Sequence, residues 1–262
     1  MSSTSLPSRP FGPRRAPAAW RWRYASPQAF YPLAGRLVAP AIAAAVLLLF
    51  AGLYIGFLVA PTDAQQGEAY RILYVHVPAA WMAMVIYLAM AFWGALGLVL
   101  NARLSFMMMQ ALAPTGALFA FVCLWTGALW GRPTWGTWWV WDARLTSVLI
   151  LLFLYIGFIA LQSAVDDARR ADRAGALVAL VGAVNVPIIY FSVQWWNTLH
   201  PGASISLRSA PTMAAPMLLG LLLCTLGVWA YAIAAVLQRL RCIVLEREHD
   251  AQWIKHLPEL AR

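Results

Sequence analysis

Six segments of this chain are apolar over about 20 residues, the length that an α-helix needs to cross the hydrocarbon core of a bilayer. They lie at about 37–60, 79–100, 105–129, 145–163, 174–192 and 213–237. The loops between them are short and leave no room for a separate soluble domain. We therefore predict an all-α fold, a polytopic membrane helix bundle with six transmembrane helices over 37–238, followed by a cytoplasmic tail over 239–262.

The composition supports a membrane protein. Hydrophobic residues make up 62% of the chain and charged residues 11%, whereas soluble domains carry about 25% charged residues. The first 36 residues are rich in Pro and Arg and lead into a stretch of full spanning length, unlike a cleaved secretory signal. We predict a disordered, basic tail over 1–36. Pro114 lies near the start of the third segment, and Pro187 lies inside the fifth, where neighbouring helices can satisfy a freed carbonyl.

The arginines indicate an orientation. If the N-terminus is cytoplasmic, the outer connections hold only four of the 19 Lys and Arg residues, namely Arg71, Arg132, Arg144 and Arg208. Such a positive-inside bias predicts that both termini are cytoplasmic. The net charge of +9 then reflects topology and contact with the lipid bilayer, and we expect no binding of nucleic acid.

The positions of the cysteines and of the single lysine exclude several kinds of functional site. Cys123, Cys224 and Cys242 form no CxxC pair, so the chain has neither a thioredoxin-like motif nor a CxxCH motif for covalent haem attachment. Lys255 is the only lysine and precedes His256, so it cannot belong to a P-loop. We therefore expect no ATPase activity in this chain.

Two histidines fall on the outer side. The predicted outer connections lie at about 61–78, 130–145 and 193–212. His76 and His200 are at similar depth there, and a proline follows each within two residues. Two imidazoles from separate elements suit axial ligation of haem iron, whereas zinc or copper would need further ligands. Spacing alone leaves interfacial hydrogen bonding by these histidines equally open.

Tryptophan is concentrated in the second outer connection. The cluster consists of Trp130, Trp135, Trp138, Trp139 and Trp141, with Trp195 and Trp196 in the next outer connection. An aromatic belt at the membrane interface explains one or two tryptophans at a helix end, but this cluster exceeds that need. If the segment is helical, Trp135, Trp138, Trp139 and Asp142 share one face. A porphyrin ring could lie on that face.

The arginines in the outer connections also suit the binding of haem. Arg144, Arg71 and Arg208 could pair with the two haem propionates. Asp142 could orient Arg144, a tryptophan indole or a backbone amide, and Arg132 suits a lipid headgroup. Asn185, a polar residue inside the fifth segment, suggests a helix–helix hydrogen bond.

Three motifs resemble one known family. The run WGTWWVWDARLTS at 135–147 resembles the signature of the "WWD" haem-handling membrane proteins of cytochrome c biogenesis. Among these proteins, RILYVHVP at 71–78 and WWNTLH at 195–200 are similar to the haem exporter protein C family, CcmC. The resemblance extends from about residue 30 to 240, and the Arg- and Pro-rich N-terminal extension lies outside it.

This resemblance implies a function. Members of the family lie in the bacterial inner membrane and present haem b on its periplasmic side to the haem chaperone CcmE, beside the ABC ATPase subunit CcmA, the membrane subunit CcmB and the small single-span protein CcmD. It implies a haem-transfer subunit of an ABC-transporter-type complex that is not itself an enzyme. The implied axial ligands are His76 and His200, and Arg71 and Arg144 would bind the propionates. The implied haem platform and chaperone contact consists of Trp135, Trp138, Trp139, Trp141 and Asp142.

Two other functions are compatible with these residues. A cytochrome c synthetase of the WWD type would attach haem to apocytochrome, although such relatives have more spans and more histidines. A b-type electron-transfer cytochrome would also use two histidines, but it would not need the tryptophan cluster. No span carries a line of polar residues, so the sequence does not indicate how haem reaches the outer side.

Overall fold

The computed structural model describes residues 25–196, 198, 200 and 211–257. Within these residues it contains helices and no β-sheet, and six helical segments are long and apolar enough to span a membrane, which confirms the predicted fold class. The segments are α1 Pro27–Tyr54 with the π-helix η1 Ile55–Val59, the 3₁₀ helix η2 Glu68–Ile72 with α2 Leu73–Leu100, α3 Arg103–Trp135, α4 Ala143–Ala164, α5 Ala168–Gly182 with α6 Asn185–Trp195, and α7 Ala215–Arg247. A short helix, α8 Gln252–Lys255, follows α7.

The helices run beyond the predicted spans, with ends at capping residues. The Ser26 hydroxyl accepts a hydrogen bond from the amide of Ala29, so α1 begins inside the range predicted as a tail. The rest of that tail, residues 1–24, lies outside the described residues. Gly136 ends α3 in the left-handed conformation with φ of 78°, where a side chain would be strained. Asp142 caps α4 through the amide of Leu145 at 2.8 Å.

The two prolines behave differently. The third helix passes through Pro114 without interruption. The fifth segment breaks into α5 and α6 at Ala183 and Val184, three to four residues before Pro187. Pro187 lacks an amide proton and its ring crowds the carbonyl four residues earlier, which belongs to Ala183. Asn185, next to this break, donates from Nδ2 to the carbonyl of Ser147 at 2.9 Å, which confirms its role in helix packing.

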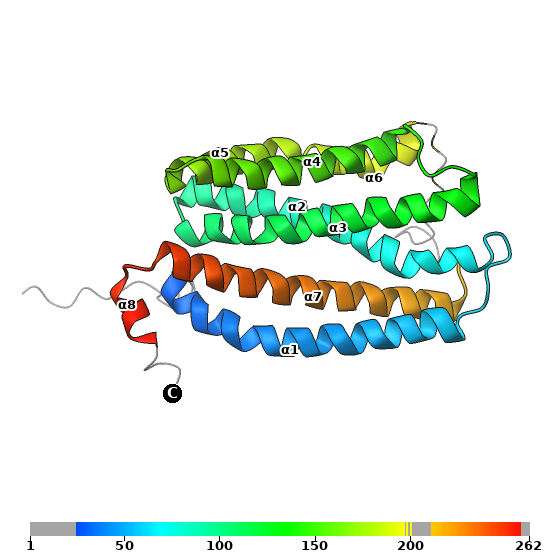
Figure 1. The fold of residues 1–262 in the computed structure, drawn as a ribbon, viewed down its shortest axis with the longest axis horizontal. Coiled ribbons are helices and arrows are strands. Elements are labelled where there is room, and N and C mark those ends of the chain that lie inside the picture. Colours follow the sequence, from blue (N-terminus) through cyan, green and yellow to red (C-terminus); the bar gives the residue numbers. More distant parts are fainter. Residues whose placement is uncertain (1–24, 197, 199, 201–210, 258–262) are drawn as a thin grey trace, which may run out of the picture.

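The bundle has α2 and α3 at its centre (Figure 1). On one side α7 packs on both central helices, and α1 packs mainly against α7. On the other side lie α4 and the pair α5–α6. The main core joins residues from α2 to α7 and includes the fully buried Tyr87, Met109 and Tyr155. Because α1 has few other partners, most of its apolar side chains face outward, as lipid contact requires.

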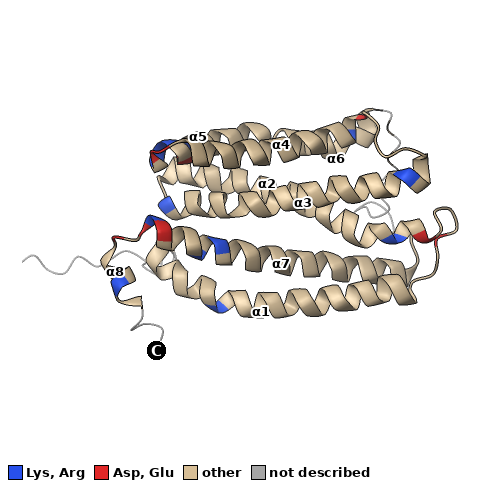
Figure 2. Ribbon diagram, viewed as in Figure 1, with Lys and Arg blue, Asp and Glu red and all other residues tan. Residues whose placement is uncertain are grey.

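Charged residues gather at the two ends of the bundle (Figure 2). We call the end with the 60–72 and 136–142 connections the histidine end, since it carries His76. At the opposite end Arg247 of α7 binds the buried carboxylate of Asp172 in α5 through two nitrogens, at 2.7 and 2.9 Å. This ion pair fixes α7 against α5 where the helices leave the apolar layer.

Candidate functional site

His76 is buried at the histidine end, in the first turns of α2. Its Nδ1 lies 3.0 Å from the hydroxyl of Thr126 in α3. One turn further along α3, the Trp130 ring meets the imidazole edge-on, with ring centres 5.6 Å apart. Between these residues, Gly127 leaves room for the imidazole, because a Cβ there would lie 3.1 Å from Cε1 of His76. The imidazole of His76 therefore packs against one face of α3.

The structure brings His200 to His76, as the sequence predicts for a two-histidine site. The centres of the two imidazole rings are 6.5 Å apart and the rings are inclined by 32°. Trp135, the last residue of α3, lies on another side of His200 with ring centres 6.4 Å apart. The two histidines thus converge from α2 and from the chain after α6.

Arg144 connects this pair to α4 and α6. It lies in the first turn of α4, and its Nη1 is 3.3 Å from Nδ1 of His200. Its Nε donates to the hydroxyl of the buried Ser192 at 3.1 Å, and Nη2 donates to the carbonyls of Ile189 and Tyr190. The guanidinium therefore places a positive charge beside His200 and holds the start of α4 against α6.

The tryptophan-rich connection is not helical after Trp135. The shared helical face that the sequence suggests for Trp135, Trp138, Trp139 and Asp142 therefore does not form, since Gly136 ends α3 and a new helix begins only at Ala143. The residues Trp138 and Trp141 are 55% and 77% exposed. Trp139 is partly buried and packs edge-on against Trp141, with ring centres 5.4 Å apart.

Two buried polar atoms in this connection lack a partner. Among the described residues, the indole nitrogen of Trp139 and Oδ2 of Asp142 make no hydrogen bond. The other oxygen of Asp142 accepts from the Leu145 amide, so a backbone amide is the group that Asp142 orients. Buried polar atoms are usually paired, and these two remain available to a ligand or partner.

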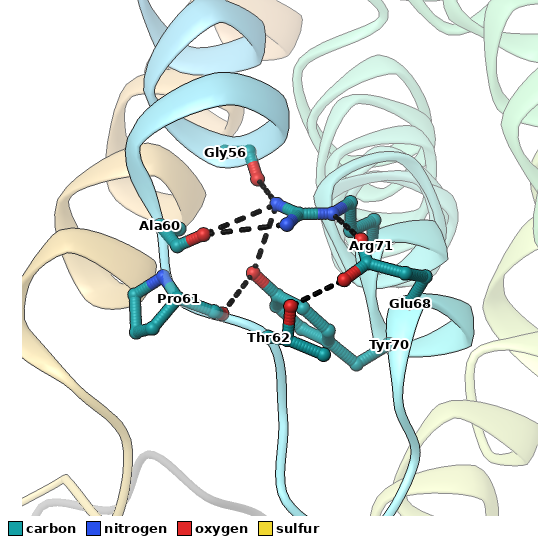
Figure 3. Close-up of polar contacts among 7 residues, drawn as sticks. All are labelled: Gly56, Ala60, Pro61, Thr62, Glu68, Tyr70 and Arg71. Carbon is teal, nitrogen blue, oxygen red and sulfur yellow. Dashed lines mark hydrogen bonds and ion pairs between the residues drawn. The ribbon is translucent and has the colours of Figure 1, made fainter.

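Figure 3 shows the contacts of Arg71, which are made with residues other than those that Arg144 contacts. The guanidinium of Arg71 donates to the carbonyls of Gly56, within η1, and of Ala60, which follows η1, and it pairs with Glu68. Tyr70, which Arg71 also contacts, donates to the carbonyl of Pro61 at 2.8 Å. Arg71 therefore binds the last carbonyls of the first membrane segment, as a C-terminal cap does. These contacts direct its guanidinium to the end of the first membrane segment.

The remaining outer residues are less closely connected to the histidines. Arg132 is exposed and donates to the carbonyl of Gly136. Trp195 and Trp196 are about half exposed, and Trp195 stacks on Phe191. Arg208, the third candidate for the propionates, lies outside the described residues.

The ring centres of His76 and His200 are 6.5 Å apart. A metal bound by imidazole lies about 2 Å from the nitrogen, so ring centres on opposite sides of one iron are about 6 Å apart. Among the described residues, no group of three or more His, Cys, Asp or Glu side chains could hold a metal ion. Two axial imidazoles with the porphyrin supplying the other ligands fit this donor set.

Sequence reasoning missed four residues of the site. Thr126 and Gly127 contact His76, and the hydroxyl of Ser192 accepts a hydrogen bond from Arg144. Trp130 belongs to the tryptophan cluster, but nothing in its position indicated that it would meet His76. Thr126 and Trp130 are four residues apart on α3 and so share a face. This spacing points to the site only after one of the two residues is known to contact His76.

Known proteins resemble the chain over most of its length. Residues 20–255 match the family CcmC, described as heme exporter protein C. Heme exporter protein C of Haemophilus influenzae is 44% identical over 242 residues, which cover 92% of this chain and 98% of that protein. Heme exporter protein C of Escherichia coli is 44% identical over 234 residues, covering 89% and 94%. A putative cytochrome c biosynthesis ccmC-like mitochondrial protein of Marchantia polymorpha is 52% identical over 154 residues, covering 59% and 65%.

Proposed function

The chain belongs to the heme exporter protein C family, and on this premise we propose that it holds haem b between His76 and His200 and hands it to the haem chaperone CcmE. The observation that carries the proposal is the convergence of two imidazoles, with ring centres 6.5 Å apart, at one end of a membrane bundle. In this proposal each histidine gives one axial ligand to the iron. The chain is then a binding and transfer subunit in cytochrome c maturation rather than an enzyme.

The other residues of the site would position the haem. Arg144 is the cation beside the histidine pair, so we assign a propionate to it first. Arg71 remains a candidate for the second propionate, although its present hydrogen bonds go to the end of η1. Trp135 packs on His200 and would cover part of the porphyrin. Burial of the porphyrin ring against such side chains adds the apolar part of the binding free energy.

The exposed tryptophans are suited to a protein partner. Trp138 and Trp141 present large apolar surfaces to the outside, and aromatic residues of this kind are enriched in protein interfaces. With Trp139 and Asp142, whose buried polar atoms lack partners among the described residues, they would form the contact for the chaperone. Haem must leave this site during transfer, so we expect intermediate rather than very tight affinity.

The cellular setting follows from the same premise. The protein is a multi-pass membrane protein, which we place in the bacterial inner membrane with cytoplasmic termini and a periplasmic haem site. Its proposed partners are the ATPase subunit CcmA, the membrane subunit CcmB and the small single-span protein CcmD, as well as CcmE. The ATP hydrolysis of such a complex would reside in CcmA.

Purification of wild type, His76→Ala and His200→Ala tests the ligands and the transfer together. Absorption spectra report iron ligation, and a haem stain reports loading of co-expressed CcmE. We expect both variants to lose the wild-type spectrum and most of the loading. Wild-type spectra and normal loading in both variants would reject the assignment of the histidines.

The two alternative functions predict other results in the same preparation. A cytochrome c synthetase would co-purify with apocytochrome and leave CcmE unloaded. An electron-transfer cytochrome would cycle reversibly with a quinone and retain its haem in the presence of the chaperone.

A further inference from the structure

The hydroxyl of Thr126 has only one proton, and its partners within α3 are carbonyl oxygens. Thr126 Oγ1 lies 2.6 Å from the carbonyl oxygen of Val122 and 3.3 Å from that of Cys123. A carbonyl oxygen can only accept, so the hydroxyl donates within the helix, a common arrangement for threonine. Toward Nδ1 of His76, at 3.0 Å, the same oxygen can then act only as an acceptor.

We infer that Thr126 is a positioning residue that keeps His76 in the tautomer protonated at Nδ1 and thereby leaves Nε2 as the nitrogen that can bind iron. This inference rests on the proposed function, because it concerns the ligand that holds haem. In a neutral imidazole one nitrogen donates and the other accepts. The hydrogen bond made by one nitrogen therefore decides which nitrogen remains available to a metal.

The packing around His76 limits the orientation of the ring. Gly127 faces it, and a Cβ there would lie 3.1 Å from Cε1 and 3.6 Å from Nδ1. The edge-on contact with Trp130 restricts the ring from the next turn of α3. Rotation of the imidazole away from Thr126 is therefore opposed by contacts on the same helix. Partners of this kind orient metal-binding histidines and make the ligand nitrogen more basic.

The first test observes the tautomer without haem. Nitrogen-15 NMR of the haem-free protein labelled at histidine distinguishes Nδ1–H from Nε2–H, and His76→Ala identifies the signal. We expect Nδ1–H in wild type and in Thr126→Ser, which keeps the hydroxyl. Thr126→Val has nearly the same shape without the acceptor, and we expect its His76 signal to shift toward Nε2–H. An unchanged tautomer in Thr126→Val would overturn the inference.

The second test measures haem binding in the same proteins. Loss of a partner that orients a metal ligand reduces affinity about 10- to 100-fold, and we expect a loss in this range for Thr126→Val, with recovery in Thr126→Ser. Thr225→Val is the control, since Thr225 makes the same bond to a carbonyl one turn earlier, that of Leu221, in α7. Equal affinities for Thr126→Val and wild type would contradict the inference.

The result for His76→Ala separates the two proposals. If His76→Ala keeps haem with a wild-type spectrum, the ligand assignment in the proposed function fails. If His76→Ala loses haem while Thr126→Val matches wild type in tautomer and affinity, only the role of Thr126 fails.

Discussion

Arg144 donates a hydrogen bond to Nδ1 of His200, over a distance of 3.3 Å between residues that are 56 positions apart. Arginine has no acceptor, so Nδ1 of His200 must accept and a neutral His200 carries its proton on Nε2. Toward Thr126, by contrast, His76 donates from Nδ1. These hydrogen bonds leave His76 in the tautomer that the proposed ligation through Nε2 needs, whereas His200 would have to change its hydrogen bonding to ligate through that nitrogen.

Removal of the Arg144 guanidinium is expected to weaken haem retention. Arg144→Ala removes the cation beside the histidine pair and the bonds that hold α4 to α6. We expect an affinity loss of about tenfold or more, the scale seen when a partner of a metal ligand is removed. Arg132→Ala is the matched control, because Arg132 is an outer arginine whose hydrogen bond, among the described residues, goes to Gly136 in its own connection. Spectral titration of both variants with haem measures the effect, and equal affinities would remove Arg144 from the site.

We expect Arg71 to contribute more to the stability of the fold than to haem binding. Arg71→Ala removes the donor to the carbonyls of Gly56 and Ala60 and the contact with Tyr70. We expect the Tm of the haem-free protein in detergent, followed by circular dichroism, to fall by several degrees. Arg71→Lys keeps the positive charge but lacks the planar guanidinium with its several N–H donors, so it should recover only part of the loss in Tm. If Arg71→Ala keeps the wild-type Tm but loses haem, Arg71 binds a propionate, as the sequence alone suggests.

Hydropathy predicted the number and order of the membrane segments because bilayer thickness sets their length. It placed the end of the last segment near residue 237, whereas α7 continues to Arg247. The arginines beyond that point have protein partners that hydropathy does not include. Arg239 donates to the Ala111 carbonyl and the Thr115 hydroxyl, and Arg247 pairs with Asp172. A helix therefore persists where composition alone predicts a tail.

The candidate site was predictable to the extent that its residues are chemically distinctive. Histidine, arginine and clustered tryptophan can be recognised in a sequence, and His76, His200 and Arg144 do converge. The roles of Thr126 and Gly127 depend on how α3 is rotated against α2, which no local pattern specifies. The non-helical connection depends on Gly136, whose positive φ ends α3 before the cluster is complete.

Close packing of α1 on α7 is expected to depend on Gly52. A Cβ at Gly52 would lie 2.7 Å from both the backbone nitrogen and the sulfur of Cys224, and a backbone atom cannot move aside alone. Overpacking of this kind costs roughly 1–3 kcal/mol, and α1 has few other contacts to compensate. Gly52→Ala should lower the free energy of unfolding in mixed micelles, measured by tryptophan fluorescence.

Gly157→Ala is the control for that change. No atom lies within 4 Å of a Cβ at Gly157 in α4, and alanine stabilises a helix by roughly 0.5–1 kcal/mol relative to glycine. The two substitutions should therefore act in opposite directions. Equal effects would mean that α1 is not held by this close approach.

Natural cysteines offer a test of the proposed orientation. Cys123 and Cys224 are buried, whereas Cys242 is exposed near the end of α7. If the positive-inside rule holds, Cys242 lies on the cytoplasmic side, and a membrane-impermeant maleimide should not label it in intact spheroplasts but should label it after lysis. Gln65→Cys, at an exposed position of the 60–72 connection, should be labelled in intact spheroplasts. Labelling of Cys242 before lysis would reverse the orientation and put the two histidines on the cytoplasmic side, where a periplasmic chaperone could not reach them.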